Sequence, residues 1–254
     1  MTAPVNNTVM RWFFSIALLV FLQSHGFAAQ PLCAAQSFEG NAYSVCRIDL
    51  RDMRLETYNL DSAGQPLASF DVLAGNLKAQ GKELRFAMNA GMFDANLKPI
   101  GLYVEDGSQS KKLNNRSGYG NFHLKPNGVF YVDGDRLGVV ATDEYIKSGL
   151  KPDFATQSGP MLVINGTIHP KFSETGTSYK RRNGVGMVDE HTAVFVITEN
   201  AVNFYAFAKF FRDGLKCANA LFFDGSISGL YSPDLGRDDG FVPLGPMVGA
   251  VDLR

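Results

Sequence analysis

Short apolar runs separated by hairpin-turn dipeptides recur along this chain, and they constrain its fold more than any other feature. The segments 128–140 and 159–170 each hold two such runs, joined at Asp133-Gly134 and at Asn165-Gly166. Two-residue hairpin turns favour Asn-Gly and Asp-Gly because their central positions require a positive φ. The pattern therefore predicts a sheet in which neighbouring strands are mostly antiparallel.

The remaining runs extend this sheet and add few helices. A third hairpin is predicted over 184–198, and 43–50 and 54–60 are predicted to pair across the short link 51–53. Single strands are predicted at 67–73, 83–93, 101–107 and 218–224, and helices at 142–150, with Thr142 as its cap, and at 203–214, between Asn203 and Gly214. We therefore expect an α+β fold: one domain with a mostly antiparallel mixed sheet and few helices.

The N-terminus has the pattern of an export signal. The apolar run 12–22 is short for a membrane span, and Gly26-Phe27-Ala28 suits cleavage after a small residue. Residues 1–28 are predicted to be a signal peptide and 29–254 the folded domain, with an uncleaved anchor as the alternative. We therefore expect a periplasmic or secreted protein without a stable membrane span after cleavage.

Export to an oxidising compartment would allow two of the three cysteines to form a disulfide. Cys33 and Cys46 lie close together near the predicted mature N-terminus, so in an oxidising compartment they are expected to pair. Cys217 follows the predicted helix in apolar company and is expected to be a buried thiol. The formal net charge is -1 and no basic block stands out, which argues against nucleic acid as the partner.

Small and polar residues follow directly where four apolar runs end, at 88–93, 156–162, 181–188 and 222–229. Asp224 is the one acid at the centre of such a turn, and it suits a general acid or base. Arg182 has the fork geometry that matches phosphate or carboxylate. The residues predicted to bind substrate are Asn89, Gly91, Gln157, Ser158, Asn183, Gly225, Ser226 and Ser228. Each turn taken singly is also compatible with an ordinary loop, with Arg182 as a solvated charge.

Several chemistries are disfavoured by the same sequence. It has no zinc-ligand spacing, no Walker loop, no dinucleotide fingerprint and no Gly-x-Ser-x-Gly elbow. The motifs require no metal and no cofactor. Glycoside hydrolysis normally uses a second carboxylate, and the sequence leaves Asp94, Glu105, Asp106 and Glu174 open for that role.

The four turns together resemble the phosphodiester glycosidase family, which includes N-acetylglucosamine-1-phosphodiester alpha-N-acetylglucosaminidase. Four stretches are similar to its motifs in order and in place: NAGMFD at 89–94, QSGPMLVINGTI at 157–168, Arg182 with Gly186, and LFFDGSIS ending at Ser228. The resemblance covers roughly residues 84 to 232. The family's triple glycine is replaced here by Gly225-Ser226-Ile227, which suggests a distinct exported, bacterial-type branch.

The resemblance implies hydrolysis of a sugar-1-phosphodiester, with release of the sugar from a phosphomonoester. Asp224 would orient the sugar, activate water or attack, and Arg182 and backbone amides near Gly91 and Gly225 would stabilise the departing charge. The expected partner is a small molecule or glycan that carries such a diester. Three alternatives stay open: an exported protein that binds glycans or sugar phosphates without turnover, a phosphodiesterase that cuts the P–O bond, and a structural envelope protein that needs no ligand.

Overall fold

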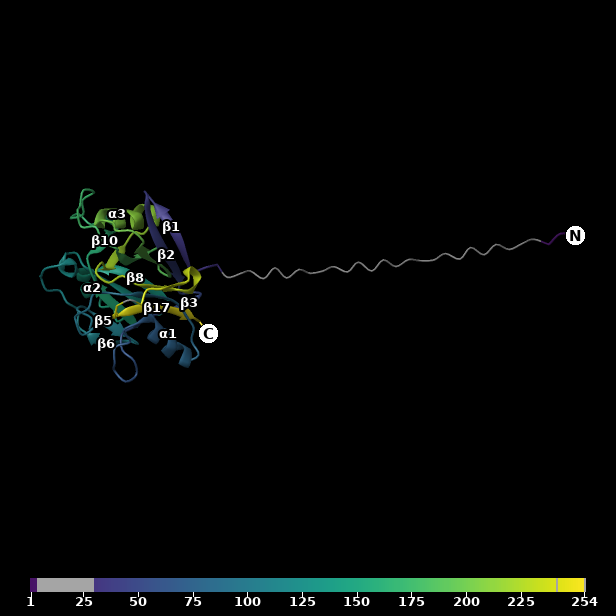
Figure 1. Ribbon diagram of the computed structural model, residues 1–254, viewed down its shortest axis with the longest axis horizontal. Helices are drawn as coiled ribbons and strands as arrows, with labels where there is room; N and C mark the ends of the chain where they lie inside the picture. The colour runs from purple at the N-terminus through teal and green to yellow at the C-terminus, as the bar shows by residue number, and fades with distance from the viewer. Residues whose placement is uncertain (4–29, 241, 254) are drawn as a thin grey trace. The chain divides into compact units, whose positions relative to one another are not determined.

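Three sheets built from antiparallel strand pairs carry the fold of this computed structural model, which describes residues 1–3, 30–240 and 242–253. From residue 4 on, the predicted signal peptide and its cleavage site lie outside the described residues. Within the described part of the chain, no helix is long and apolar enough to cross a membrane. The expectation of an α+β fold with mostly antiparallel strands is confirmed (Figure 1).

The largest sheet holds the strand that ends at Asp224. The strands of this sheet follow one another in the order β1 (Cys33–Phe38), β2 (Asn41–Asp49), β13 (Thr192–Thr198), β12 (Asn183–Met187), β14 (Ala220–Asp224), β10 (Met161–Ile164) and β11 (Thr167–Ile168). Cys33 and Cys46 face each other across β1 and β2 and form a disulfide with an S–S distance of 2.06 Å. The predicted cysteine pairing is therefore confirmed, and Cys217 is a buried free thiol, as expected.

Two five-stranded sheets complete the framework. The second sheet orders β16 (Arg237–Asp238), β15 (Leu230–Ser232), β4 (Leu84–Asn89), β17 (Met247–Asp252) and β3 (Met53–Tyr58). The third orders β6 (Ser108–Lys111), β5 (Tyr103–Glu105), β9 (Phe154–Ser158), β7 (Gly128–Asp133) and β8 (Arg136–Ala141). The hairpins predicted at Asp133-Gly134, at Asn165-Gly166 and over 184–198 are confirmed.

The core lies where the three sheets meet. Phe195 of the first sheet packs 4.9 Å from Phe86 of the second and 5.7 Å from Phe130 of the third, measured between ring centroids. Phe223, one residue before Asp224, lies 6.4 Å from both Phe130 and Phe195. Offset and edge-on aromatic pairs of this kind add to the free energy gained from burial. The strand that delivers Asp224 is thereby anchored in the centre of the molecule.

Helices cover the outer faces and are short. They are α1 (Phe70–Ala79), α2 (Thr142–Ser148) and α3 (Phe204–Lys209), with single turns η1 (Asn121–His123), η2 (Phe210–Gly214) and η3 (Pro233–Leu235). Asn203 caps α3 through Ala206 N, and η2 continues it to Gly214, so the predicted helix at 203–214 is confirmed. Figure 1 shows α3 beside β10 at one end of the fold and α1 near β17 at the other.

Three local predictions are wrong. The segment predicted as a strand at 67–73 leads into α1 and forms its first turn. The Ser69 side chain caps this helix by accepting a hydrogen bond from Val72 N. The side chains of Phe70, Leu73 and Leu77 share one buried face at helical spacing. The strands at 43–50 and 54–60 do not pair: β2 lies in the first sheet and β3 in the second.

Thr142 does not cap α2. It is the first residue of that helix, it follows Ala141 as the N-cap, and its Oγ1 accepts a hydrogen bond from Gln157 Nε2 at 3.2 Å. The side chain that looked like a helix cap therefore contacts another part of the fold.

Candidate active site

Three strands end or begin at the same place. Asn89 is the last residue of β4, Asn183 the first of β12 and Asp224 the last of β14. Asn183 is paired with Asp224 in the register of β12 and β14. Apolar strands from two different sheets thus bring two amides and one carboxylate together, although Asn89 and Asn183 lie far apart in the sequence.

The two asparagines form a buried, fully hydrogen-bonded pair. Asn183 Nδ2 donates to Asn89 Oδ1 at 2.8 Å, and Asn183 Oδ1 accepts from Asp224 N at 3.0 Å. Asn89 Nδ2 donates to Ile227 O at 2.7 Å, and Asn89 Oδ1 accepts from Gly229 N at 2.9 Å. Buried amides without partners would cost free energy, so this pairing also stabilises the fold. Its geometric effect is to hold both ends of the segment 224–229, which we call the Asp224 loop.

Asp224 is enclosed by its own loop. Its Oδ1 accepts hydrogen bonds from Gly225 N at 2.6 Å and Ser226 N at 2.8 Å, and only 9% of the residue is exposed. Burial raises the pKa of the Asp224 carboxyl, because desolvation disfavours the charged form, and the backbone N–H groups oppose that rise. Ser228 Oγ donates to Asp224 O at 3.2 Å. A positioned carboxyl with a raised pKa suits proton transfer.

Arg182 is a buried cation behind the Asp224 loop. Its guanidinium carbon lies 3.6 Å from the centroid of the Phe204 ring and 5.5 Å from that of Phe222. Its Nε donates to Val202 O at 3.0 Å and its Nη2 to Ser178 O at 2.6 Å. The side chain is fully buried, so the alternative that Arg182 is a solvated charge is wrong.

One nitrogen of Arg182 points at the loop. Nη1 is buried and has no hydrogen-bond partner among the described residues, and it lies 3.5 Å from the position that a Cβ on Gly225 would occupy. Burial lowers the pKa of Arg182 to about 10, which still leaves the side chain protonated at neutral pH. An uncompensated positive charge therefore lies directly behind Gly225.

Gln157 is engaged within the protein. Its Oε1 accepts from Leu102 N at 3.0 Å and from Asn114 N at 2.9 Å, and its Nε2 donates to Asn114 O at 2.9 Å. The structure thus places this residue as a brace between β9 and the segment around Asn114, and does not bring its amide into contact with the Asp224 loop.

Ser158 and Gly91 also serve the framework. Ser158 Oγ donates to Phe223 O at 2.8 Å, so it holds β14 immediately before Asp224. Gly91 has φ +97°, and a Cβ there would lie 2.6 Å from Thr156 Oγ1. A side chain at this position is therefore excluded both by the backbone conformation and by the close approach of β9.

The acids considered for a second carboxylate have other contacts. Asp94 Oδ1 accepts from Asn96 N and Lys98 N and closes its own turn. Glu105 accepts from Tyr103 Oη at 2.8 Å in the third sheet. Asp106 lines a cavity beside β3, and Glu174 lines a separate cavity together with Tyr205 and Lys209.

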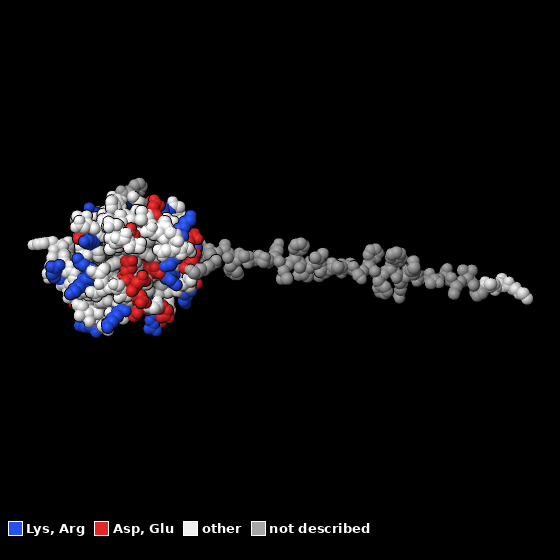
Figure 2. Space-filling view, turned by 90° about the horizontal axis from the view of Figure 1, so that it is seen from below, with Lys and Arg blue, Asp and Glu red and all other residues white. Residues whose placement is uncertain are grey.

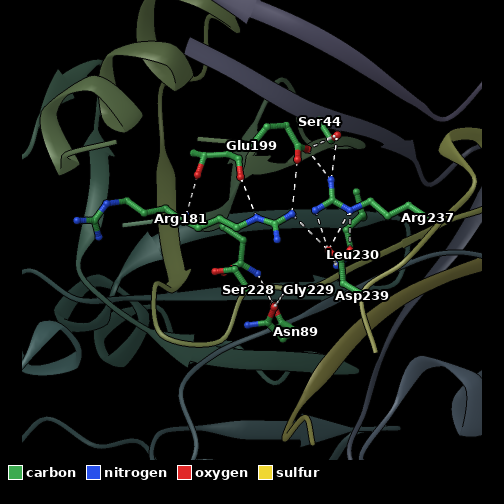
Figure 3. Close-up of polar contacts among 12 residues, drawn as sticks. Ser44, Asn89, Arg181, Glu199, Ser228, Gly229, Leu230, Arg237 and Asp239 are labelled. Atoms are coloured by element: carbon green, nitrogen blue, oxygen red, sulfur yellow. Dashed lines mark hydrogen bonds and ion pairs between the residues drawn. The ribbon is translucent and has the colours of Figure 1, made fainter. Parts of the chain in front are cut away.

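Sequence reasoning missed a charged cluster that contacts the Asp224 loop. Asp239 Oδ2 accepts from Leu230 N at 3.1 Å, directly after Gly229 (Figure 3). Arg237 donates to Asp239 through Nη2 at 2.7 Å and to Glu199 through Nη1 at 2.5 Å. The charged run 237–239 before Gly240 was the signal in the sequence, but its partners come from strands elsewhere in the chain.

Comparison with known proteins gives a family and a fold. A family model described as phosphodiester glycosidase matches residues 82–234. The uncharacterized protein YigE of Escherichia coli K12 is 40% identical over 178 residues, covering 70% of this chain and 69% of that protein.

Two solved structures share the fold. The catalytic domain of zebrafish N-acetylglucosamine-1-phosphodiester alpha-N-acetylglucosaminidase, described as auto-inhibited by its pro-peptide, matches with a TM-score of 0.59 at 16% identity, over 89% of this chain and 85% of its own. A hypothetical protein from Synechocystis matches with a TM-score of 0.55 at 14% identity, over 87% and 61%.

Proposed function

This chain belongs to the phosphodiester glycosidase family, and we propose that it hydrolyses the bond between the anomeric carbon of a sugar and the phosphate of a sugar-1-phosphodiester. Family membership supports the reaction class. The observation that carries the proposal for this chain is Asp224, a buried carboxyl with a raised pKa, held by two asparagines in front of an uncompensated arginine.

Asp224 acts as the general base in this proposal. A phosphomonoester is a weakly basic leaving group, so its departure needs little protonation, and the larger requirement is to activate water. A raised pKa makes the Asp224 carboxylate a stronger base. Water attacks the anomeric carbon while its proton passes to Asp224. The C–O bond to phosphate breaks, and free sugar and a phosphomonoester leave.

Positive charge and N–H groups offset the charge that develops on the departing phosphate. Arg182 lies behind Gly225, where the low dielectric of its surroundings strengthens its field. Ser226 is exposed at the front of the loop and can contact substrate hydroxyls, whereas Ser228 and Asn183 hold the loop in shape. In this proposal Gln157, Ser158, Asn89 and Gly91 act by positioning the strands.

The substrate is proposed to lie outside the cytoplasm. The Cys33–Cys46 disulfide supports an oxidising compartment. We retain the interpretation of 1–28 as a signal peptide and 29–254 as the domain, in the periplasm or as a secreted protein.

The direct test is release of free sugar from a panel of sugar-1-phosphodiesters by the purified chain, including N-acetylglucosamine-1-phospho compounds. Asp224→Asn and Arg182→Met run beside the wild type, with thermal unfolding to show that each variant is folded. Turnover by the wild type and its loss in folded Asp224→Asn is the expected result.

Two other outcomes would redirect the proposal. Saturable binding of a diester without turnover would indicate a binding protein, for which the replacement of the family's triple glycine by Gly225-Ser226-Ile227 is the motivating feature. A reaction in ¹⁸O-labelled water that places the label in the phosphate would indicate a phosphodiesterase that cuts the P–O bond, whereas label in the sugar is expected for C–O cleavage.

A further inference from the structure

Arg181 is adjacent to Arg182 in the sequence but lies in a contrasting environment. Its side chain is 42% exposed, whereas Arg182 is fully buried. Arg181 Nε donates to Thr198 O at 3.1 Å, which orients the guanidinium. Within the part of the chain that the structure describes, neither Nη nitrogen of Arg181 forms a hydrogen bond. The N–H groups of both Nη nitrogens on this oriented, accessible fork are therefore not committed to hydrogen bonds.

The two carboxylates beside Arg181 also hydrogen-bond Arg237. Arg181 Nη2 lies 3.5 Å from Glu199 Oε2 and 3.6 Å from Asp239 Oδ2, distances that suit ion pairs but are long for hydrogen bonds. Arg237 hydrogen-bonds both carboxylates at 2.5 Å and 2.7 Å. Arg237 bonds both oxygens of Asp239 and Oε1 of Glu199, so turning the Arg181 Nη groups toward an incoming anion would break only the ion pairs to Asp239 Oδ2 and Glu199 Oε2 and would keep the Nε anchor.

Arg181 also lies at the edge of the Asp224 loop. Its carbonyl oxygen is 3.5 Å from the Cβ position of Gly225, and the Asp239 oxygen that its Nη2 faces accepts a hydrogen bond from Leu230 N. Figure 3 shows that Asp239 lies between Arg181, with which it forms an ion pair, and Leu230, the residue after the loop, whose N–H donates to it. A phosphate held by Arg181 would thus lie beside the loop that carries the working carboxyl.

We propose that Arg181 is the residue that binds the phosphate group of the substrate and of the phosphomonoester product, with both Nη groups donating to phosphate oxygens. The inference rests on the proposed function and names a further substrate-binding residue of that site. An arginine fork matches two phosphate oxygens at once. The buried guanidinium of Arg182 supplies charge from behind the loop, whereas Arg181 supplies the direct contact.

Phosphate binding tests this role without turnover. Inorganic phosphate and methyl phosphate are titrated into the full chain by calorimetry. The dissociation constant of Arg181→Gln is expected to be about 10- to 100-fold higher than that of the wild type, the loss typical of hydrogen bonds to a charged group. Arg181→Lys keeps the charge without the fork and should give an intermediate value. The matched control is Arg136→Gln, which removes another exposed arginine with one carboxylate neighbour and should bind as the wild type does.

Kinetics separates a phosphate contact from a structural role. With a sugar-1-phosphodiester, Arg181→Gln should raise KM by the same factor, whereas hydrolysis of an uncharged aryl glycoside of the same sugar should be unchanged. Equal losses on both substrates, or phosphate affinity equal to that of the wild type, would overturn the inference. Arg181-dependent phosphate binding in a chain that hydrolyses no diester would retain this binding role and overturn the proposed hydrolysis. Diester hydrolysis that is unchanged in Arg181→Gln would retain the proposed hydrolysis and overturn the binding role of Arg181.

Discussion

Two regions of this molecule each hold a buried acid, Asp224 in one and Glu56 in the other, and they differ in how that acid is held. The Asp224 loop presents one carboxyl, bonded to backbone N–H groups and backed by Arg182. A cavity of about 420 Å³ beside β3 and α1 is lined by several acids, Glu56, Asp61, Glu105 and Asp106. Figure 2 shows acidic side chains gathered on the face seen from below.

Glu56 and Glu105 of this cavity are paired locally with ordinary structural partners. Glu56 Oε2 accepts from Tyr58 Oη at 2.9 Å and lies 3.8 Å from Lys82 Nζ. Glu105 accepts from Tyr103 Oη. Burial and the neighbouring carboxylate raise the pKa of Tyr58. The comparison teaches that many acids around a large hollow do not by themselves indicate chemistry. One carboxyl held by a network from two sheets, next to a buried arginine with one unbonded nitrogen, is the stronger indication.

The largest effect on kcat is expected when the buried acid of the Asp224 loop is replaced, and the buried acid of the cavity serves as the control. Asp224→Asn is expected to lower kcat by about 10²- to 10⁴-fold, the usual contribution of a general base. Glu56→Gln is the matched control, since Glu56 is 8% exposed and Asp224 is 9% exposed. Its kcat should stay at the wild-type level. Sugar release under saturating diester measures both, and a comparable loss in Glu56→Gln would remove the distinction between the regions.

Breaking the asparagine pair should give the next largest effect. Asn183→Ala leaves Asp224 N and the Asn89 amide without their partner, which should cost about 1–3 kcal/mol of unfolding free energy. A displaced Asp224 loop should also lower kcat by about 10²-fold, because geometry controls the reaction. Urea unfolding and sugar release check the two effects. Asn76→Ala, at an exposed position lining the acidic cavity, should change neither.

The pH dependence should distinguish the Asp224 carboxyl from an ordinary aspartate. Because its folded-state pKa is raised, the folded chain binds this proton more tightly than the unfolded chain does. The contribution of Asp224 to stability is therefore present at low pH and is lost as pH rises through the folded-state pKa. Asp224→Asn does not lose stability in this way. The difference between its melting temperature and that of the wild type should therefore shift in favour of the variant as pH increases.

The kcat should also depend on the ionisation of Asp224, but it should rise with pH where the contribution of Asp224 to stability falls. A general base works when deprotonated, so kcat should rise with pH through the raised pKa of Asp224. A pH–rate profile that falls across that window would instead assign Asp224 the role of general acid. A difference in melting temperature that does not change with pH would contradict the raised pKa itself.

The smallest effect is expected in the acidic cavity. Tyr58→Phe removes the hydrogen bond to Glu56 and should lower the unfolding free energy by about 0.5–1.5 kcal/mol. The kcat should not change, because this contact lies in a region assigned no chemistry. Chemical unfolding and sugar release measured on one preparation make the check. A clear loss of kcat would mean that the two regions are coupled.

Local sequence signals predicted much of the strand framework. The turn residues Gly134, Asn165 and Gly166 have the positive φ that two-residue hairpin turns need, so the hairpins at 128–140 and 159–170 followed from neighbouring residues alone. The same reasoning failed at 67–73, where Ser69 capping and the spacing of buried Phe70 and Leu73 make a helix. A short apolar run does not distinguish strand from helix by itself.

By itself the sequence determined the hairpins, the disulfide pairing and the position of Asp224 at the end of a buried strand, because these depend on residues close together in the chain. Only the tertiary structure decided that β2 and β3 enter different sheets, that Asn89 meets Asn183, and that Arg182 is buried while Arg181 is exposed. Contacts between distant segments are set by how the three sheets pack around the shared core. No local preference of the residues involved encodes that packing.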